Sequence, residues 1–228
     1  MRTPAPESRP VALTIAGSDS GGGAGIQADL ATMAAHGVFG TSAITAVTAQ
    51  NTRGVASSHV LPGDEVDAQL EAVTDDFAVG AAKTGMLATT EVIETVADHA
   101  QGFDFPLVVD PVMVATSGDR LLEPEAERAY EDLLSAATVA TPNADEAEVL
   151  TDIAVTDAES AREAGEAILE TGVDAVLIKG GHVPGERVRD TLVTADTVRA
   201  FDHPRVATDA THGSGCTIAA AIAARLAK

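Results

Sequence analysis

The feature that most constrains the fold is a regular alternation of two patterns. Short apolar runs bounded by glycine or proline alternate with longer stretches of helical periodicity, which is typical of a largely parallel β-sheet with helices on both faces. A chain of 228 residues, of which 45% are hydrophobic, can bury one sizeable core, and no linker interrupts it. We therefore expect one α/β domain over residues 1–228. The expected strands are residues 11–16, 42–48, 55–61, 78–83, 106–110, 138–141, 174–178, 191–194 and 198–201, with the last two as candidates for antiparallel pairing.

Polar or glycine residues stand at or just past many of these strands. In open α/β sheets, ligands bind outside the carboxyl ends of the strands. The sequence therefore predicts one crevice lined by residues from several parts of the chain, namely Gly17, Gln50, Lys83, Asp110, Asn143 and Lys179.

A glycine-rich turn at residues 209–216 runs into an alanine-rich helical stretch at residues 217–228. Gly213 and Gly215 let the backbone turn sharply, so unpaired N–H groups converge at the helix start, where they would suit a phosphoryl group in transfer. Cys216 would stand at the same place. A lone cysteine is most often a small buried hydrophobe, but a helix N-terminus lowers a thiol pKa, so Cys216 is also a candidate proton acceptor. His182 and His212 are adjacent alternatives that we rank lower, because histidines beside glycine turns are usually structural.

A second glycine cluster, at residues 17–25, follows the first strand and precedes a helix expected at residues 26–35. The spacing fits the G-x-G-x-x-A pattern of dinucleotide folds, but no acidic residue occurs between Asp29 and Asp64 to hold a ribose. A P-loop is excluded, because no glycine is followed by Lys-Ser or Lys-Thr in the required frame. Asp29 is either a ligand-binding carboxylate facing the crevice or a solvated residue on the helix face.

Asp110 and Glu146 are the candidates for handling Mg²⁺, which takes oxygen ligands and often needs only one or two carboxylates beside substrate phosphates. Asp110 ends an apolar strand, and Glu146 lies three residues past Asn143. That spacing also fits a helix N-cap with its capping-box partner. The two roles are compatible.

The formal net charge of −21 excludes nucleic acid and anionic membranes as partners, because both would be repelled. Acidic runs at residues 64–67, 123–132 and 157–170 indicate a surface adapted to high salt.

The N-terminal ten residues lack the apolar core of a signal peptide, so we expect a cytoplasmic protein. The single cysteine permits no internal disulfide. Lys83 and Lys179 are two of only three lysines, which makes them candidates for specific contacts, although leftover surface charge is the alternative.

Seven blocks, in order, resemble the hydroxymethylpyrimidine/phosphomethylpyrimidine kinases of thiamin synthesis, within the ribokinase-like superfamily. The blocks are residues 16–29 (AGSDSGGGAGIQAD), 45–52 (TAVTAQNT), 83–87 (KTGML), 110–113 (DPVM), 141–143 (TPN), 179–182 (KGGH) and 211–216 (THGSGC). The resemblance implies a ribokinase-like three-layer α/β sandwich. It also implies ATP- and Mg²⁺-dependent phosphorylation of 4-amino-5-hydroxymethyl-2-methylpyrimidine and then of its monophosphate, by a homodimer.

The resemblance also assigns roles by matching motif. Asp29 and Gln50 would hold the aminopyrimidine between walls formed by Gly17, Met86 and Val112. Asp110 and Glu146 would organise Mg²⁺, and the ATP phosphates would meet Asn143, Lys179 and Thr211. The anion hole would comprise Gly213, Ser214, Gly215 and Cys216, with Cys216 as the base and Lys179 as a further catalytic group.

Members of the resembling family usually continue past the glycine-rich turn with a further segment that helps to enclose the adenine, so we expect a domain that lacks the usual C-terminal segment. Two alternatives stay open. Some pyridoxal kinases look similar and also place cysteine at the base position. The short C-terminus would also fit a non-catalytic pyrimidine-binding protein.

Overall fold

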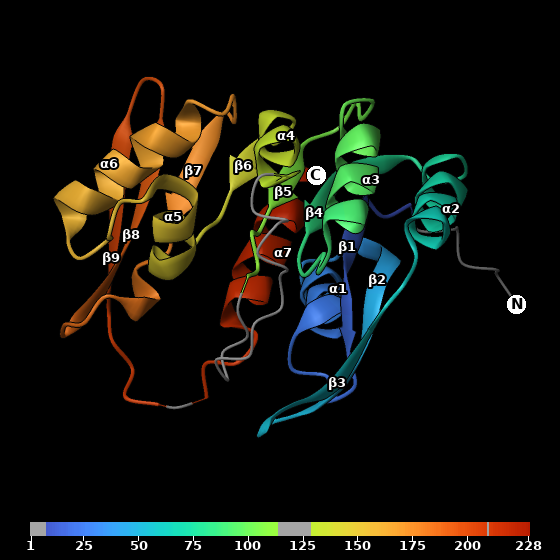
Figure 1. The fold of residues 1–228 in the computed structure, drawn as a ribbon, viewed down its shortest axis with the longest axis horizontal. Coiled ribbons are helices and arrows are strands. Elements are labelled where there is room, and N and C mark those ends of the chain that lie inside the picture. Colours follow the sequence, from blue (N-terminus) through green and yellow to red (C-terminus); the bar gives the residue numbers. More distant parts are fainter. Residues whose placement is uncertain (1–7, 114–128, 209) are drawn as a thin grey trace, which may run out of the picture.

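The computed structural model describes residues 8–113, 129–208 and 210–228. These residues form one nine-stranded sheet with the order β3-β2-β1-β4-β5-β6-β7-β8-β9 (Figure 1). Strands β1, β2, β4, β5, β6 and β7 are parallel, whereas β3 pairs antiparallel with β2, and β8 and β9 pair antiparallel at the other edge. The predicted mostly parallel sheet is confirmed, including the late antiparallel strands.

Four strands, β1, β2, β8 and β9, are longer than the predicted runs, β3 and β4 are shifted by one residue, and β5, β6 and β7 are shorter than predicted. The strands are β1 (Val11–Asp19), β2 (Phe39–Asn51), β3 (Gly54–Val60), β4 (Val79–Thr84), β5 (Leu107–Val109), β6 (Val139–Ala140), β7 (Ala175–Ile178), β8 (Arg187–Thr194) and β9 (Val198–Pro204). β2 is much longer than residues 42–48, because its second half pairs with β3 in a two-stranded arm that projects beyond the sheet (Figure 1).

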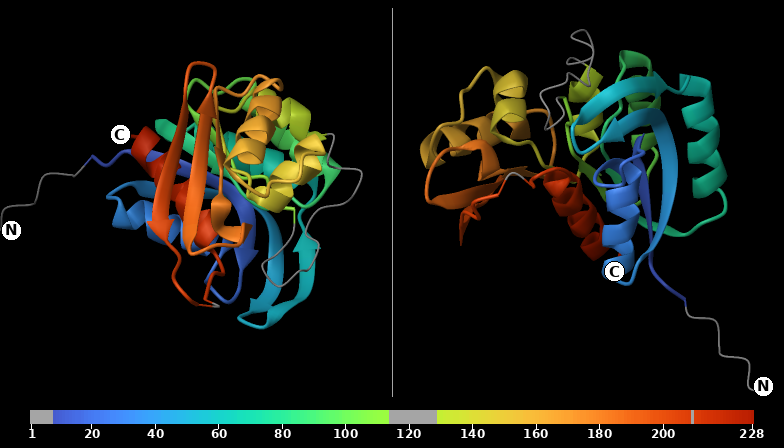
Figure 2. Two further views of the ribbon diagram at one scale, coloured as in Figure 1. Left: turned by 90° about the vertical axis from the view of Figure 1, so that its left-hand side faces the viewer. Right: turned by 90° about the horizontal axis from the view of Figure 1, so that it is seen from below.

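Helices cover both faces of the sheet, as the alternation of patterns predicts. α1 (Gly25–Ala35) and α7 (Ser214–Leu226) pack together on one face (Figure 2). The other face carries α2 (Gly63–Thr74), α3 (Thr90–Ala100), α4 (Ala129–Ser135), α5 (Ala144–Thr151) and α6 (Ala158–Leu169). This arrangement is a three-layer sandwich.

The main hydrophobic core lies between the sheet and the larger helical layer, and it contains side chains such as Ile15, Leu70, Ile93, Leu107 and Ile168. The opposite layer is thinner because α7 presents alanines to the sheet. Ala219, Ala220, Ala223 and Ala224 are all fully buried, so the helix approaches β4 and β5 closely. This close approach brings the N-terminus of α7 to the carboxyl ends of the central strands.

The acidic side chains predicted to face solvent do so in the part of the chain that is described. Asp64 and Glu65 are exposed in the first turn of α2, and Glu159 lies exposed in the first turn of α6. Most of the acidic run at residues 123–132 lies outside the described residues. Among the residues described, no helix combines the length and the apolarity that a membrane crossing requires.

Candidate active site

Lys179 is the centre of a buried ionic cluster at the ends of β5, β6 and β7. Its Nζ lies 2.7 Å from Asp110 Oδ1 and 3.8 Å from Glu146 Oε2. Thr141 donates its hydroxyl to the same Asp110 oxygen at 2.9 Å. All four side chains are buried. The structure thus joins the lysine predicted to meet phosphates with both carboxylates predicted to organise Mg²⁺.

The charges of this cluster are strongly coupled. Burial disfavours the ionised form of Asp110, but the attraction of Lys179 and Lys83, together with the hydrogen bonds from Lys179 and Thr141, outweighs it and lowers the pKa of the carboxyl. Burial, reinforced by repulsion from Asp110, raises the pKa of Glu146 to about 7, although Lys179 opposes the change. Burial likewise opposes the charge of Lys179, yet the two carboxylates raise its pKa. The cluster therefore holds one stable ion pair and a second carboxyl that changes charge near neutral pH.

Asn143 and Glu146 form the predicted capping box of α5. The Asn143 side chain accepts a hydrogen bond from the Glu146 N–H at 2.9 Å, and Glu146 Oε2 accepts one from the Asn143 N–H at 2.8 Å. The Asn143 backbone also pairs with that of Lys179. The capping role is confirmed, and it fixes the position of Glu146 beside Lys179. A contact of Asn143 with ATP phosphates stays a prediction.

The glycine-rich turn before α7 lies against this cluster. A Cβ atom at Gly215 would lie 3.2 Å from Lys179 Nζ and 3.9 Å from Asp110 Oδ2. Gly213 is the N-cap of α7 with φ of 78°, and a Cβ atom there would lie 1.8 Å from the Gly23 carbonyl oxygen, so only glycine fits. Ser214 and Thr211 are exposed at the turn. The Ser214 N–H donates to the Thr211 carbonyl at 3.1 Å and closes the turn. The start of α7 thus lies beside the Lys179 ammonium.

Cys216 is the third residue of α7 and is half-buried. Burial raises the pKa of its thiol, and the nearby Lys83 ammonium and a hydrogen bond from the Gly25 N–H only partly offset this effect. The expectation of a lowered pKa for Cys216 is wrong, because burial of the thiolate, reinforced by the carboxylates of Asp110 and Asp29, outweighs these favourable contacts. At neutral pH the ligand-free protein holds Cys216 as a thiol.

Lys83 and Asp29 form a second buried ion pair, which joins β4 to α1. Lys83 Nζ lies 3.0 and 3.1 Å from the two carboxylate oxygens, and Thr14 donates its hydroxyl to Asp29 at 2.7 Å. Both charged side chains are fully enclosed. The interpretation of Lys83 and Lys179 as surface charges is wrong, as is that of Asp29 as a solvated residue. A direct contact of Asp29 with substrate stays a prediction.

The residues predicted as substrate walls lie around the ends of β1, β4 and β5. Gly17 and Met86 are in contact, since a Cβ atom at Gly17 would lie 3.0 Å from Met86 Cε. Val112 is half-buried two residues past Asp110. Gln50 lies at the end of β2, where its Nε2 is 3.3 Å from His212 Nε2.

Two functional candidates, Asp19 and His212, were missed or ranked low from sequence. Asp19 accepts hydrogen bonds from the N–H groups of Gly21, Gly23 and Ala24, and thereby shapes the glycine cluster at residues 17–25. His212 Nε2 lies 3.1 Å from Asp19 Oδ2, which joins the two glycine-rich turns. An aspartate two residues before a glycine run is a signal for such a turn and could have identified Asp19.

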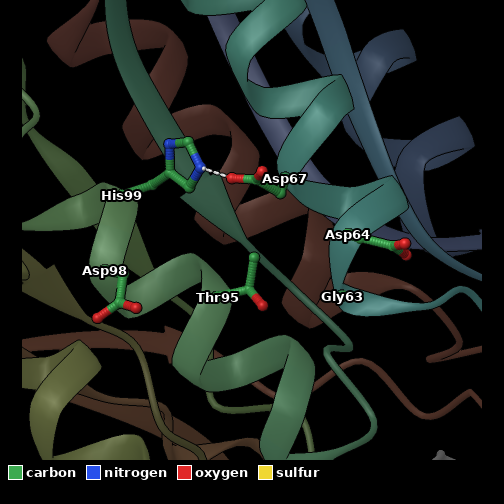
Figure 3. A pocket seen from close by; sticks show the side chains of 6 residues that line it. All are labelled: Gly63, Asp64, Asp67, Thr95, Asp98 and His99. Atoms are coloured by element: carbon green, nitrogen blue, oxygen red, sulfur yellow. Dashed lines mark hydrogen bonds and ion pairs between the residues drawn. The ribbon is translucent and has the colours of Figure 1, made fainter.

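A hollow of about 430 Å³ lies elsewhere, between α2 and α3. Figure 3 shows its lining side chains, including Asp64, Asp67 and Asp98, and the 2.6 Å contact between His99 and Asp67. None of the predicted site residues lines it. Its acidic lining is unsuited to a phosphate-bearing ligand.

The fold and the site together define a ribokinase-like kinase of small molecules, with a glycine anion turn at a helix N-terminus facing a lysine and two carboxylates. The profile of the family described as phosphomethylpyrimidine kinase matches residues 19–228. The chain therefore belongs to the phosphomethylpyrimidine kinase family.

Individual relatives agree with this placement. A hydroxymethylpyrimidine/phosphomethylpyrimidine kinase of Rhizobium meliloti is 52% identical over 221 residues, covering 96% of this chain and 83% of the relative. The crystal structure of phosphomethylpyrimidine kinase from Clostridium difficile 630 is 42% identical, with a TM-score of 0.84, covering 95% of this chain and 90% of that one. An ADP complex of Bacillus subtilis pyridoxal kinase is 38% identical, with a TM-score of 0.89 and coverage of 96% and 85%.

Proposed function

We propose that this chain transfers a phosphoryl group from ATP to the hydroxymethyl group of 4-amino-5-hydroxymethyl-2-methylpyrimidine, and then phosphorylates the monophosphate to the pyrophosphate. The observation that carries the proposal is the contact of the glycine-rich turn before α7 with the buried ionic cluster around Lys179. There Gly215 lies against Lys179 and Asp110. The names of the Rhizobium and Clostridium relatives support the pyrimidine substrate. The ADP bound to the Bacillus pyridoxal kinase supports an adenine nucleotide as donor.

The phosphate end of the site would work by positioning and charge stabilisation. Lys179 is held by two carboxylates, so its ammonium is fixed in place and stays protonated when a phosphate arrives. The backbone N–H groups of Gly213, Gly215 and Cys216 would donate to the equatorial oxygens of the transferred phosphoryl group, whereas the Ser214 N–H is bonded to the Thr211 carbonyl and closes the turn. Asn143 and Thr211 would contact the remaining phosphates. Phosphoryl transfer passes through a loose transition state, which such fixed donors stabilise well.

The residues present fit a magnesium ion. Asp110 and Glu146 each use one oxygen within the protein, and their second oxygens receive no hydrogen bond from the described residues. Hard carboxylate oxygens of this kind suit Mg²⁺, which commonly keeps several waters and bridges to phosphates. When bound, the ion would neutralise charge on the phosphates of the nucleotide.

The pyrimidine would lie at the ends of β1, β2 and β4, between Gly17, Met86 and Val112. The Gln50 amide offers both a donor and an acceptor to an aminopyrimidine ring. Asp29 would act on the pyrimidine either through the ammonium of Lys83, with which it is paired, or by direct contact with the ring.

Cys216 is proposed as the acceptor of the hydroxyl proton. Its position at the start of α7 and the nearby Lys83 support this role, whereas its raised pKa limits the thiolate available at neutral pH. The rate should therefore depend on pH in the alkaline range.

The test is a product analysis by mass spectrometry after incubation with ATP, MgCl₂ and either the aminopyrimidine alcohol or pyridoxal. We expect a monophosphate and then a pyrophosphate of the pyrimidine. Phosphorylation of pyridoxal alone would favour the pyridoxal kinase alternative. Tight binding of the pyrimidine by calorimetry without any product would favour a non-catalytic binding protein.

We also propose that the protein is a homodimer, as the family resemblance suggests. Light scattering on the purified protein would give twice the mass of one chain. A monomeric mass across a range of concentrations would contradict the proposal.

A further inference from the structure

His212 lies between the two glycine-rich turns and touches a residue of the proposed pyrimidine site. Its Nε2 is 3.1 Å from Asp19 Oδ2 and 3.3 Å from Gln50 Nε2. Asp19 ends β1, Gln50 is near the end of β2, and His212 directly precedes the N-cap of α7. One imidazole nitrogen therefore meets two side chains from two different strand ends.

Asp19 determines which atom carries the proton at this junction. Its carboxylate accepts hydrogen bonds from the N–H groups of Gly21, Gly23 and Ala24 and is 3% exposed. Burial opposes its ionisation, but His212 and the backbone donors outweigh that effect and lower its pKa. An ionised carboxylate only accepts, so the His212 Nε2 that faces it must carry hydrogen.

Only one orientation of the Gln50 amide then agrees with all of its hydrogen-bond partners. If the amide nitrogen faced His212 Nε2–H, two donors would oppose each other. At the other end of the amide, Thr48 Oγ1 has one proton but lies within reach of both the Ser18 carbonyl, at 2.9 Å, and Gln50 Oε1, at 3.0 Å. Turning the amide end for end removes both conflicts, because the amide NH₂ then donates to Thr48, Thr48 donates to Ser18, and the amide oxygen accepts from His212.

We propose that His212 is a positioning residue that locks the Gln50 amide in this orientation and thereby selects a 4-aminopyrimidine over its 4-oxo analogue. The inference rests on the proposed function. A 4-aminopyrimidine presents an amino donor beside a ring-nitrogen acceptor, and the locked amide offers the complementary oxygen and N–H. The 4-oxo analogue presents the reverse pair, a carbonyl acceptor beside a ring N–H, and fits only the reversed amide.

The experiment measures kcat/KM for the 4-amino alcohol and its 4-oxo analogue with the wild type, His212→Ala and His212→Gln. In His212→Ala the amide is free to turn, so the amino-over-oxo ratio should fall by roughly tenfold or more, through KM for the pyrimidine, with KM for ATP unchanged. In His212→Gln the new amide N–H can reach both Asp19 and Gln50, so the ratio should recover. Thr48→Val, which removes the hydroxyl at the other end of the amide and leaves Asp19 untouched, should also lower the ratio.

Thermal unfolding of each variant checks that it is folded, and Thr48→Val keeps the test decisive if His212→Ala does not fold. An unchanged amino-over-oxo ratio in the folded variants would overturn the inference, as would an equal loss of affinity for both pyrimidines and for ATP. If the wild type phosphorylates neither pyrimidine, the proposed function fails instead, so the two failures are distinguishable.

Discussion

Replacing Glu146 by glutamine should stabilise the ligand-free protein at alkaline pH while impairing the reaction. The Glu146 side chain is 7% exposed and sits beside Lys179, whose charge Asp110 already balances at 2.7 Å. An ionised Glu146 therefore adds an unbalanced negative charge to a buried cluster. Glutamine removes that charge and keeps an oxygen that can accept the Asn143 N–H in the capping box.

The magnitude follows from the raised pKa of Glu146. The pKa rises from 4.5 to about 7 on folding, and each unit corresponds to about 1.4 kcal/mol, so ionising Glu146 costs the folded state about 3 kcal/mol. The folded protein holds this proton more tightly than the unfolded chain. The cost is thus absent below pH 4.5, grows as the pH rises toward 7, and is complete above it. Because glutamine never ionises, the variant escapes the cost.

Urea unfolding at pH 5 and pH 8 measures the difference. The free energy of unfolding of Glu146→Gln should exceed that of the wild type by up to about 3 kcal/mol at pH 8 and by little at pH 5. The Tm of the variant should be higher by roughly 6–12 °C at pH 8. Glu148→Gln, an exposed position on the same helix, is the matched control and should show no such pH dependence. The same Glu146 variant should require more Mg²⁺ for half-maximal activity. Destabilisation of the variant at pH 8 would refute the reasoning, because the attraction between Lys179 and the ionised Glu146 would then exceed the cost of burying the Glu146 carboxylate.

Three further outcomes are expected. If Cys216 is the proton acceptor, turnover should rise with pH through the alkaline range, since burial raises the pKa of the thiol above its ordinary value. Cys216→Ala should lower turnover by roughly 10²–10⁴-fold and flatten the pH–rate profile, whereas unchanged turnover would leave the cysteine a packing role. Gly213→Ala should abolish phosphoryl transfer and lower Tm, because its methyl group would overlap the Gly23 carbonyl, and a variant with wild-type kinetics would contradict this packing. Because the net charge is −21, Tm should rise between 0.1 and 2 M KCl as salt screens self-repulsion, and a flat or falling Tm in circular dichroism melts would reject adaptation to salt.

The fold could be predicted from the sequence because its determinants are local. The apolar runs of β1, β4 and β7 are short and bounded by turn residues, and Gly37, whose φ is 73°, follows the end of α1. The length of β2 could not be predicted in the same way. Its second half is defined by pairing with β3 rather than by burial, so its hydrophobic pattern is weak.

The residues of the site could be predicted from the sequence, but most of the contacts between them could not. Strand ends identified Asp110 and Lys179 as neighbours in one crevice, since parallel strands end at one edge. The pairing of Lys83 with Asp29 and of His212 with Asp19 depends on how α1 and α7 pack across the sheet, which no local pattern encodes. The pKa of Cys216 was misjudged for a related reason, because the helix end is visible in sequence and the depth of burial is not.

The contact between Gly23 and Gly213 has a consequence for the order in which function appears during folding. The two turns belong to the first and last segments of regular structure, and Asp19 and His212, which join them, are 193 positions apart. Bringing such distant segments together carries a loop-closure cost that local contacts cannot offset until the intervening sheet exists. The nine strands can pair before α7 docks, but the phosphate and pyrimidine halves become one site only when it does. Appearance of ligand binding during refolding should therefore trail the appearance of β-structure, and it would report the docking of a single helix.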